Sequence, residues 1–264
     1  MVCSNKIYEY FIMNLSSNNI KSISKLQDLY LKKRFVKELK SKGSESIKKV
    51  LVKHGATEPF YGVKVEELKK IGKKIKGNQE LAMELYNTGI SDAMYLAGLV
   101  ADGSKMSKKE LEQWAERAPW QMISEYTVAW VASESKFGEE LALKWIDSKS
   151  EKISSSGWTT LGAIVTITPD DKLDIKKYKA LLDRVAKTIH KAPNRTRSTM
   201  NSFIISAGSY ISELTKYAQE ISKKIGTVMI DVGDTACKVP SAFDYIEKVK
   251  SKGKLGVKKK TAKC

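Results

Sequence analysis

Residues 80–101, ELAMELYNTGISDAMYLAGLVA, contain the pattern that decides the fold. Apolar residues at helical spacing lie on both sides of a polar turn at Thr88-Gly89, which predicts two short helices joined by that turn. A similar order recurs 60 residues later, where Glu140-Leu141-Ala142-Leu143 repeats the pattern of Glu80-Leu81-Ala82-Met83. Two unrelated amphipathic helices could share this pattern by chance. A series of stacked helix pairs explains it better, because each pair buries its apolar face against the next.

Helical spacing extends through most of the 264-residue chain, and the low content of Pro (5) and Gly (16) also favours helices over strands and turns. Ser107 and Glu110 have the spacing of a capping box, and Pro119 is a typical first-turn proline, so two helices are predicted to begin there. Only residues 226–231 resemble a strand. Further helices are predicted over residues 22–40, 64–76, 138–147, 154–166, 174–190, 193–207 and 209–226. The chain is therefore predicted to be an all-α solenoid of helix pairs.

Four regions are expected along the chain. Residues 1–42 are predicted to form an N-terminal helical extension, and residues 43–226 the repeat solenoid. Residues 227–250 are predicted to form a C-terminal extension with a short helix. Residues 251–264, SKGKLGVKKKTAKC, have almost no apolar content and are predicted to form a flexible basic tail.

Positive charge is concentrated toward the two ends of the chain. The 47 Lys and Arg residues exceed the 30 Asp and Glu residues, which gives a formal net charge of +17. Residues 1–79 have a net charge of +11, residues 175–246 of +6 and residues 247–264 of +7, whereas residues 80–174 have −7. Basic segments of this kind bind the phosphates of a polyanion, although Lys-rich helices also occur as solvated faces.

The composition argues against several classes of protein. No apolar run approaches the roughly 18 residues that a membrane span needs, and the N-terminus lacks the apolar stretch of a secretory signal. Cys3, Cys237 and Cys264 are too far apart for a disulfide framework, so a cytoplasmic protein with reduced thiols is expected. His54 and His190 do not add a metal-ligand spacing, and no phosphate-binding glycine motif occurs. We therefore expect no metal, no cofactor and no membrane partner.

Three stretches of the chain resemble the DNA alkylation repair (AlkD-like) family. They are the run Phe60-Tyr61-Gly62-Val63-Lys64-Val65 with Leu68, Lys69 and Ile71 after it, the helix around Tyr95-Leu96-Ala97, and the Trp-rich residues 118–130. The resemblance covers roughly residues 43–226. It implies a right-handed superhelical solenoid of HEAT-like antiparallel helix pairs, whose concave basic face holds duplex DNA. Characterised glycosylases of this family excise positively charged alkylated purines.

The residues that this family uses for base excision are only partly matched. The family has a Trp, an Asp four positions later, and then an Arg and a second Trp; the carboxylate stabilises the cationic sugar and the aromatic faces hold the cationic base. Trp120 matches the first Trp, but Ser124 stands four positions on, and its neighbour Glu125 is turned by about 100° on an α-helix. Residues 157–163, where the Arg is expected, contain Thr instead. The resemblance therefore predicts a divergent member that lacks the usual catalytic Asp and Arg.

Three aromatic residues and one carboxylate are the candidate lesion-binding and catalytic groups. Trp120, Tyr126 and Trp158 are predicted to face the DNA, although Trp at helical spacing more often packs in a core. Glu125 is the candidate catalytic residue in place of the family Asp. Its sequence neighbours are largely apolar, so a buried and paired Glu is the alternative.

Phosphate-binding residues are predicted at two places. Residues 193–199 begin a helix with Arg and hydroxyl side chains, and helix starts of this kind bind phosphates. Residues 64–76 carry six Lys, which also suit a DNA backbone. A solvated helix start and a solvated Lys face are the alternatives. The candidates are Lys191, Arg195, Arg197, Ser198, Lys69 and Lys73.

Three functions fit these observations. The leading one is a monomeric protein that binds duplex or damaged double-stranded DNA through a basic concave face. The second is an active monofunctional alkylpurine DNA glycosylase that uses Glu125 in place of the family Asp. The third is a helical-repeat scaffold that binds an acidic protein or RNA.

Overall fold

The computed structural model describes residues 17–233, 235 and 237–263, and every regular element within them is helical. Cys3, Cys264 and the first part of the predicted N-terminal extension lie outside the described residues. A π-helical segment, η2 (Ile123–Val128), precedes α8. In chain order the α-helices are α2 (Ser17–Ser41), α3 (Glu45–Lys53), α4 (Val65–Lys74), α5 (Gln79–Tyr86), α6 (Ser91–Val100), α7 (Lys108–Arg117), α8 (Ala129–Ser133), α9 (Gly138–Trp145), α10 (Glu151–Ile167), α11 (Ile175–Thr188), α12 (Asn194–Tyr210), α13 (Thr215–Ile225) and α14 (Ala242–Ser251).

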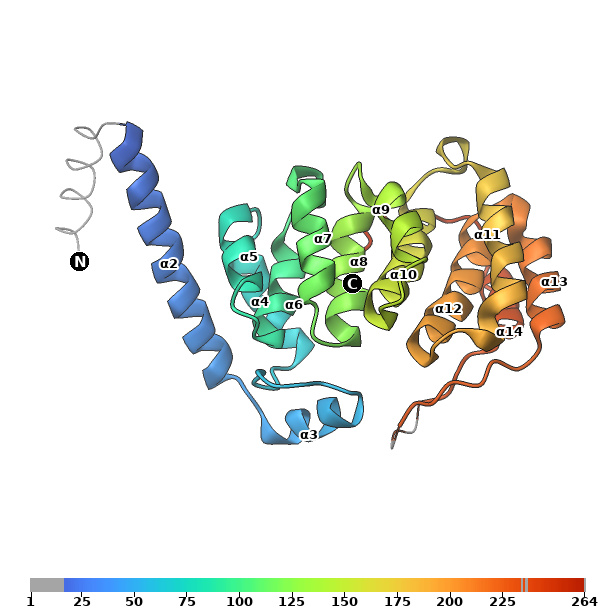
Figure 1. The fold of residues 1–264 in the computed structure, drawn as a ribbon, viewed down its shortest axis with the longest axis horizontal. Coiled ribbons are helices and arrows are strands. Elements are labelled where there is room, and N and C mark those ends of the chain that lie inside the picture. The colour runs from blue at the N-terminus through green and yellow to red at the C-terminus, as the bar shows by residue number, and fades with distance from the viewer. Residues whose placement is uncertain (1–16, 234, 236, 264) are drawn as a thin grey trace.

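Helix pairs stack into a curved solenoid, which confirms the all-α prediction (Figure 1). Helix α5 packs on α6, α9 on α10 and α12 on α13. The inner layer is continuous, because α6 contacts η2, η2 contacts α10, and α10 contacts α12. Buried apolar side chains form two clusters that meet at α9, where Leu141 belongs to one cluster and Ala142 to the other. No helix in the described part of the chain combines the length and apolarity that crossing a membrane requires.

Local signals explain several helix ends. The predicted capping box is confirmed: the Ser107 hydroxyl accepts from the backbone N–H of Glu110 at 3.3 Å, and the Glu110 carboxylate accepts from the N–H of Ser107 at 2.8 Å. Two expectations are wrong. Residues 226–231 form no strand, and the break between the last two solenoid helices follows Tyr210 instead of residue 207.

Helix α3 stands apart from the other helices, below the inner layer in Figure 1, and was not predicted from the sequence. None of its nine residues is buried. The backbone N–H of Ser44 bonds to the carbonyl of Tyr61 at 3.1 Å just before the helix, and the Gln121 side chain donates to the carbonyl of His54 at 2.7 Å just after it. The two ends of α3 are thus bonded to the solenoid, and the helix covers the space that lies between it and the solenoid.

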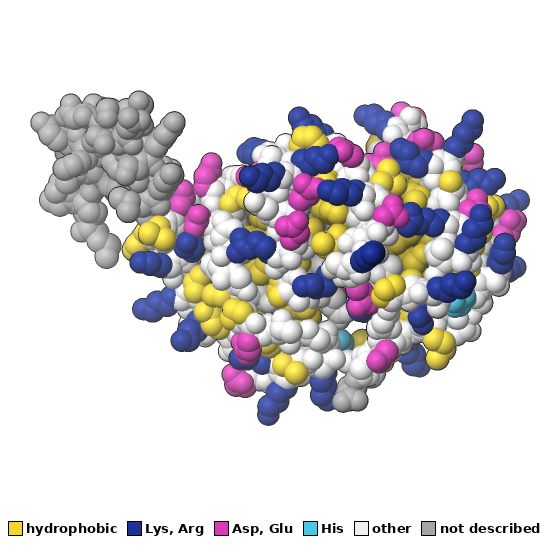
Figure 2. All heavy atoms as spheres, in the orientation of Figure 1, with side chains coloured by type: hydrophobic (Ala, Val, Ile, Leu, Met, Phe, Trp, Pro, Cys, Tyr) yellow, Lys and Arg dark blue, Asp and Glu magenta, His cyan; other side chains and the backbone are white. Residues whose placement is uncertain are grey.

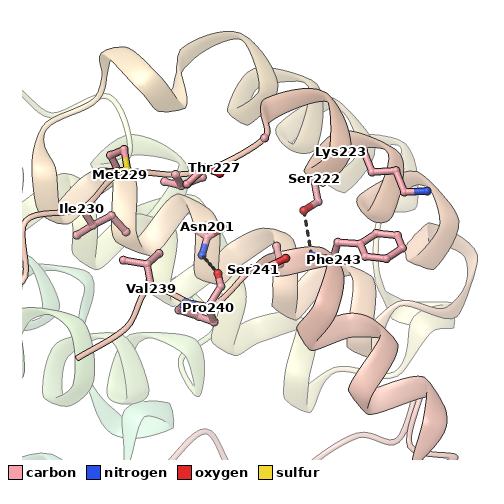
Figure 3. Close-up of a pocket in the computed structure, with 13 residues that line it drawn as sticks. Asn201, Ser222, Lys223, Thr227, Met229, Ile230, Val239, Pro240, Ser241 and Phe243 are labelled. Carbon is pink, nitrogen blue, oxygen red and sulfur yellow. Dashed lines mark hydrogen bonds between the residues drawn. The ribbon is translucent and has the colours of Figure 1, made fainter. Parts of the chain in front are cut away.

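The connection between α13 and α14, residues 226–241, extends from the end of the solenoid toward the side of α3 (Figure 1). Near its base it encloses a cavity of about 460 Å³ against α12 and α13 (Figure 3). The Asn201 side chain donates to the carbonyl of Pro240 at 3.0 Å, and the hydroxyl of Ser222 accepts from the N–H of Phe243 at 3.0 Å (Figure 3). These two bonds hold the last part of the connection and the start of α14 against the solenoid.

The C-terminal tail packs on the solenoid, whereas its composition predicts a flexible arm. The ammonium of Lys258 lies 2.7 Å from the carboxylate of Asp170. It also donates to the backbone carbonyls of Val165 at 2.9 Å and Tyr210 at 2.6 Å. These carbonyls stand at the C-terminal ends of α10 and α12, where helices leave acceptors without partners and where a cation is favoured.

The last described residues of the tail continue this arrangement at α6 and α8. The ammonium of Lys263 donates to the carbonyl of Ala101, directly after α6, and lies 3.4 Å from the carboxylate of Glu134, directly after α8. The hydroxyl of Thr261 bonds to the same carboxylate at 2.5 Å. The tail therefore crosses the C-terminal ends of α6, α8, α10 and α12. Its lysines supply hydrogen-bond donors to carbonyls at these helix ends.

Candidate nucleic-acid interface

A groove lies between α3, the start of η2 and the start of α12. It consists of two adjoining cavities that share His54, Trp120, Gln121, Tyr126 and Arg195. The inner chamber has a volume of about 340 Å³, and the outer channel about 590 Å³. The inner chamber is lined chiefly by Leu51, Tyr95, Trp120, Met122, Tyr126 and Arg195. The outer channel adds Lys53, Lys152, Asn194, Asp231 and Gly233. Together these cavities form what we call the interface groove.

Trp120 is positioned by the turn that begins at Pro119. Its side chain is 5% exposed, and the indole N–H donates to the hydroxyl of Ser91 at 3.1 Å. Because Ser91 begins α6, this bond fixes Trp120 against the preceding repeat. The part of the ring that is not covered lines both cavities. Trp120 thus forms an apolar wall of the groove.

The helix after Trp120 is not a regular α-helix. Residues Ile123–Val128 are π-helical, with hydrogen bonds that span one more residue per turn than in an α-helix. The α-helical rotation used to place Glu125 relative to Trp120 therefore does not apply inside this segment. No sequence signal recognised in advance marks the extra residue, and π-helical turns often occur at functional sites.

Glu125 and Arg195 form a two-pronged ion pair across 70 residues of sequence. The Nε atom of Arg195 lies 3.0 Å from one carboxylate oxygen of Glu125, and an Nη atom lies 2.5 Å from the other. The backbone N–H of Arg195 donates to the carboxylate of Glu151 at 2.6 Å, which fixes the start of α12 against the start of α10. Paired geometry of this kind is the strongest form of Arg–carboxylate contact.

The ion pair turns the carboxylate of Glu125 away from the groove. Glu125 is 5% exposed and lines neither cavity, whereas Arg195 is about 30% exposed and lines both. Burial raises the pKa of the Glu125 carboxyl above its usual value, and the hydrogen bonds and charge of Arg195 offset this only in part. The guanidinium of Arg195 therefore lines the groove, whereas the expected catalytic carboxylate of Glu125 does not.

The outer channel is mainly cationic at its rim. Lys53 and Lys152 are exposed and line the channel together with Arg195, while Asp231 is the one carboxylate among the described lining residues. The side chain of Asn194 bonds to the backbone of Asp231 twice, accepting from its N–H and donating to its carbonyl, each at 2.8 Å. This pair of bonds holds the connection between α13 and α14 at the edge of the groove. A polyanion is the ligand that such a rim favours.

Among the predicted aromatic residues, Trp120 and Tyr126 lie in the groove and Trp158 does not. Tyr126 is 49% exposed, and its ring meets Trp130 edge-on at 5.7 Å. Trp158 is 1% exposed and packs against Phe203 with ring centroids 5.3 Å apart. The prediction that Trp158 faces the DNA is therefore wrong, because this residue belongs to the core.

Among the predicted phosphate-binding residues, only Arg195 lies in the groove. Arg197 donates to the carbonyls of Met229 at 2.7 Å and Ala192 at 3.0 Å, so its guanidinium ties the 227–230 segment to α12. The others lie on the surface away from the groove: Lys191 and Ser198 near the start of α12, and Lys69 and Lys73 on α4.

Several groove residues were missed by the sequence prediction. Lys53, His54 and Lys152 were not candidates, because α3 was not recognised and isolated lysines at helix ends carry no signal. Gln121 and Asn194 act through bonds to backbone atoms that are distant in sequence. A contact of this kind has no local pattern in the sequence.

The charge distribution on the surface does not by itself mark the interface. Figure 2 shows Lys and Arg side chains over the whole visible face, interspersed with Asp and Glu. The groove is distinguished by the combination of aromatic walls and a cationic rim. Among the described residues, His, Cys, Asp and Glu form no group of three or more that could hold a metal ion.

Known proteins resemble this chain over most of its length. The family model described as DNA alkylation repair enzyme matches residues 35–225. The uncharacterized proteins Lin0241 of Listeria innocua and Lmo0209 of Listeria monocytogenes are 34% and 33% identical to it, over 81% and 82% of this chain and 95% and 96% of their own lengths.

A solved structure also superposes on the chain, with a TM-score of 0.81 and 38% sequence identity, and the match covers 88% of this chain and 99% of the other. That protein represents a new family related to the HEAT-like repeat DNA glycosylases, with affinity for branched DNA structures. The helix pairs, the groove and these matches lead to one assignment: the chain belongs to the DNA alkylation repair family and has its HEAT-like repeat fold.

Proposed function

We propose that this protein binds branched DNA in the interface groove and does not excise bases. The structural relative with 38% identity has affinity for branched DNA, and the similarity covers 88% of this chain and 99% of the other. The proposal also accounts for the cationic rim formed by Lys53, Lys152 and Arg195, because each lysine or arginine near a phosphate releases a counterion and strengthens binding.

The proposed absence of base excision rests on the ion pair between Arg195 and Glu125. Base excision needs a carboxylate near the sugar, where it stabilises the positive charge of the transition state. Both oxygens of Glu125 accept hydrogen bonds from Arg195, and neither faces the inner chamber. Asp92, at the edge of the neighbouring cavity beneath α3, is likewise engaged, since it accepts from the N–H groups of Tyr61 at 2.5 Å and Val63 at 2.7 Å.

Fluorescence anisotropy with labelled oligonucleotides tests the binding. A three-way junction should bind more tightly than duplex, single-stranded DNA or duplex RNA of the same length, and affinity should fall steeply with salt. The double variant Lys53→Gln/Lys152→Gln should bind the junction about tenfold more weakly, with a salt slope reduced by about two, since about one unit is lost per phosphate contact. Lys109→Gln/Lys187→Gln, which removes two exposed lysines from α7 and α11, is the matched control.

Equal loss in both double variants would place the DNA elsewhere, and tighter binding to RNA would favour the scaffold function instead. Base release is measured separately, on duplex DNA containing 7-methylguanine, with an active alkylpurine glycosylase as the positive control. No release should be detected at protein concentrations that saturate the DNA. Release that disappears in Glu125→Gln would instead establish the glycosylase function.

A further inference from the structure

We infer that the inner chamber takes up one unpaired nucleobase from the branch point, while the outer channel holds the adjoining phosphates. This inference rests on the proposed function and names the part of the DNA that the groove recognises. It starts from the chamber itself, an aromatic space of about 340 Å³ between α3 and the start of η2. That volume is at the small end of ligand sites in proteins and suits a single planar group.

The chamber is an apolar hollow that opens to the surface of the protein. Apolar side chains usually pack closely against one another in a protein interior. Here the apolar side chains of Leu51, Tyr95, Trp120 and Met122 line an open space, and a second cavity of about 250 Å³ adjoins it on the other side of the same four residues. Helix α3 covers both spaces without burying any of its own residues. An apolar ligand beneath α3 would supply the contacts that the packing lacks.

The aromatic walls have the chemistry of a base-stacking site. Trp120 is fixed by its bond to Ser91, and Tyr126 projects into the groove with 49% of its surface exposed. A nucleobase presents an aromatic face whatever its sequence, and stacking on a protein ring contributes about 1–3 kcal/mol per base. The guanidinium of Arg195 stands at the boundary between the chamber and the channel, where the sugar and phosphate of a bound nucleotide would lie.

The charges at the mouth of the chamber identify the occupant as part of a nucleic acid. A lipid chain or a neutral metabolite would gain nothing from Lys53, Lys152 and Arg195. A nucleotide unit uses both parts of the groove, its base in the apolar chamber and its phosphates in the cationic channel. A paired base of a duplex enters less readily, because unpairing and unstacking cost a few kcal/mol, whereas a branch point offers unpaired bases without that cost. Base capture therefore explains a preference for branched DNA.

The test places 2-aminopurine at an unpaired position of a three-way junction and follows both anisotropy and 2-aminopurine fluorescence. Binding of the wild-type protein should change the fluorescence of the unpaired probe and leave a probe in a paired arm unchanged. Leu51→Trp, which fills the chamber from α3, should abolish the change and reduce the preference for junction over duplex about tenfold. The matched control is Val52→Trp, the same substitution at the next residue of α3, which is 57% exposed and lies outside the chamber.

A second pair of variants guards against an effect on folding. Tyr126→Leu should weaken junction binding and the probe signal, while Tyr245→Leu on α14, with a similar exposure of 46%, should change neither. Thermal unfolding confirms that all four variants fold. Tight junction binding without any change at the unpaired probe, or a full change in Leu51→Trp, would overturn base capture and leave the proposed function standing. A lack of junction binding by the wild-type protein would overturn both.

Discussion

Arg195 holds both carboxylate oxygens of Glu125, at 3.0 and 2.5 Å, and so joins the start of α12 to the π-helical segment η2. Because Glu125 is 5% exposed and Arg195 about 30% exposed, this ion pair stands between the groove and the core. The same contact positions a guanidinium in the groove and withdraws the carboxylate from it. Under the proposed function, DNA binding in the groove and the absence of base excision both rest on this one interaction.

Arg195→Ala is expected to lower the free energy of unfolding by about 3 kcal/mol, because it leaves a buried carboxylate without its counter-ion. The double variant Glu125→Met/Arg195→Met should recover most of that loss, since it removes both charges and keeps apolar volume. Urea denaturation measures both. Lys144→Ala is the control, because Lys144 is 68% exposed in its pair with Glu112 and such surface pairs contribute at most about 1 kcal/mol. Similar losses in the two single variants would show that the Glu125 pair has no special role.

The stability of Arg195→Ala should depend on pH in a direction set by Glu125. Burial raises the pKa of this carboxyl in the folded protein above the usual value of 4.5, and removal of Arg195 raises it further. Between the two values the folded state holds a proton that the unfolded state has lost, so stability falls as pH rises through this window. The deficit of the variant relative to wild type is then smallest at acid pH and largest at neutral pH. Urea denaturation at a series of pH values measures it, and the double variant Glu125→Gln/Arg195→Ala, which lacks the titrating group, should not show the trend.

Lys258→Met should destabilise the protein by about 1–3 kcal/mol, since it removes the counter-ion of Asp170 and the donor to two helix-end carbonyls. For a chain of this size, each kcal/mol lowers the melting temperature by about 2–4 °C. Lys260→Met, at an exposed position two residues on, is the control. Affinity for junction DNA should be unchanged in both, because the groove and the tail lie at opposite ends of α12, about 25 Å apart. If Lys258→Met were as stable as wild type but bound DNA more weakly, the result would show that the tail contacts DNA.

Gly138→Ala should cost about 1–3 kcal/mol, because a Cβ at this position would lie 2.1 Å from the carbonyl oxygen of Ala132 and force the α8–α9 turn apart. Gly72→Ala is the matched control within α4, where the nearest atom to an added Cβ is 3.5 Å away. Alanine there should stabilise the protein by about 0.5–1 kcal/mol, since it restricts the unfolded chain. Thermal unfolding distinguishes the two; equal effects would show that the α8–α9 turn adapts freely.

Prediction from the sequence succeeded where the signal is local and periodic. The helix pairs, the capping box at Ser107 and the family resemblance all follow from residues that are close together in the chain. It failed for Trp158, because a helical Trp on an inner helix has the same spacing whether it faces the core or the ligand. It also failed for the tail, since the lysines of a solvated arm and the lysines that bind helix-end carbonyls have the same composition.

The amino-acid sequence by itself determined an all-α chain of stacked helix pairs and membership of the DNA alkylation repair family, because helical periodicity and short motifs are encoded in consecutive residues. Only the tertiary structure decided how Glu125 is paired, since its partner Arg195 is 70 residues away and Glu125 lies in a π-helical segment that the sequence did not reveal. The same holds for the inner chamber, whose walls come from α3, α4, α6, η2 and α12. A groove forms where segments that are distant in the sequence lie side by side. Which side chains pair along it depends on distances in space, and the spacing of residues in the sequence does not fix those distances.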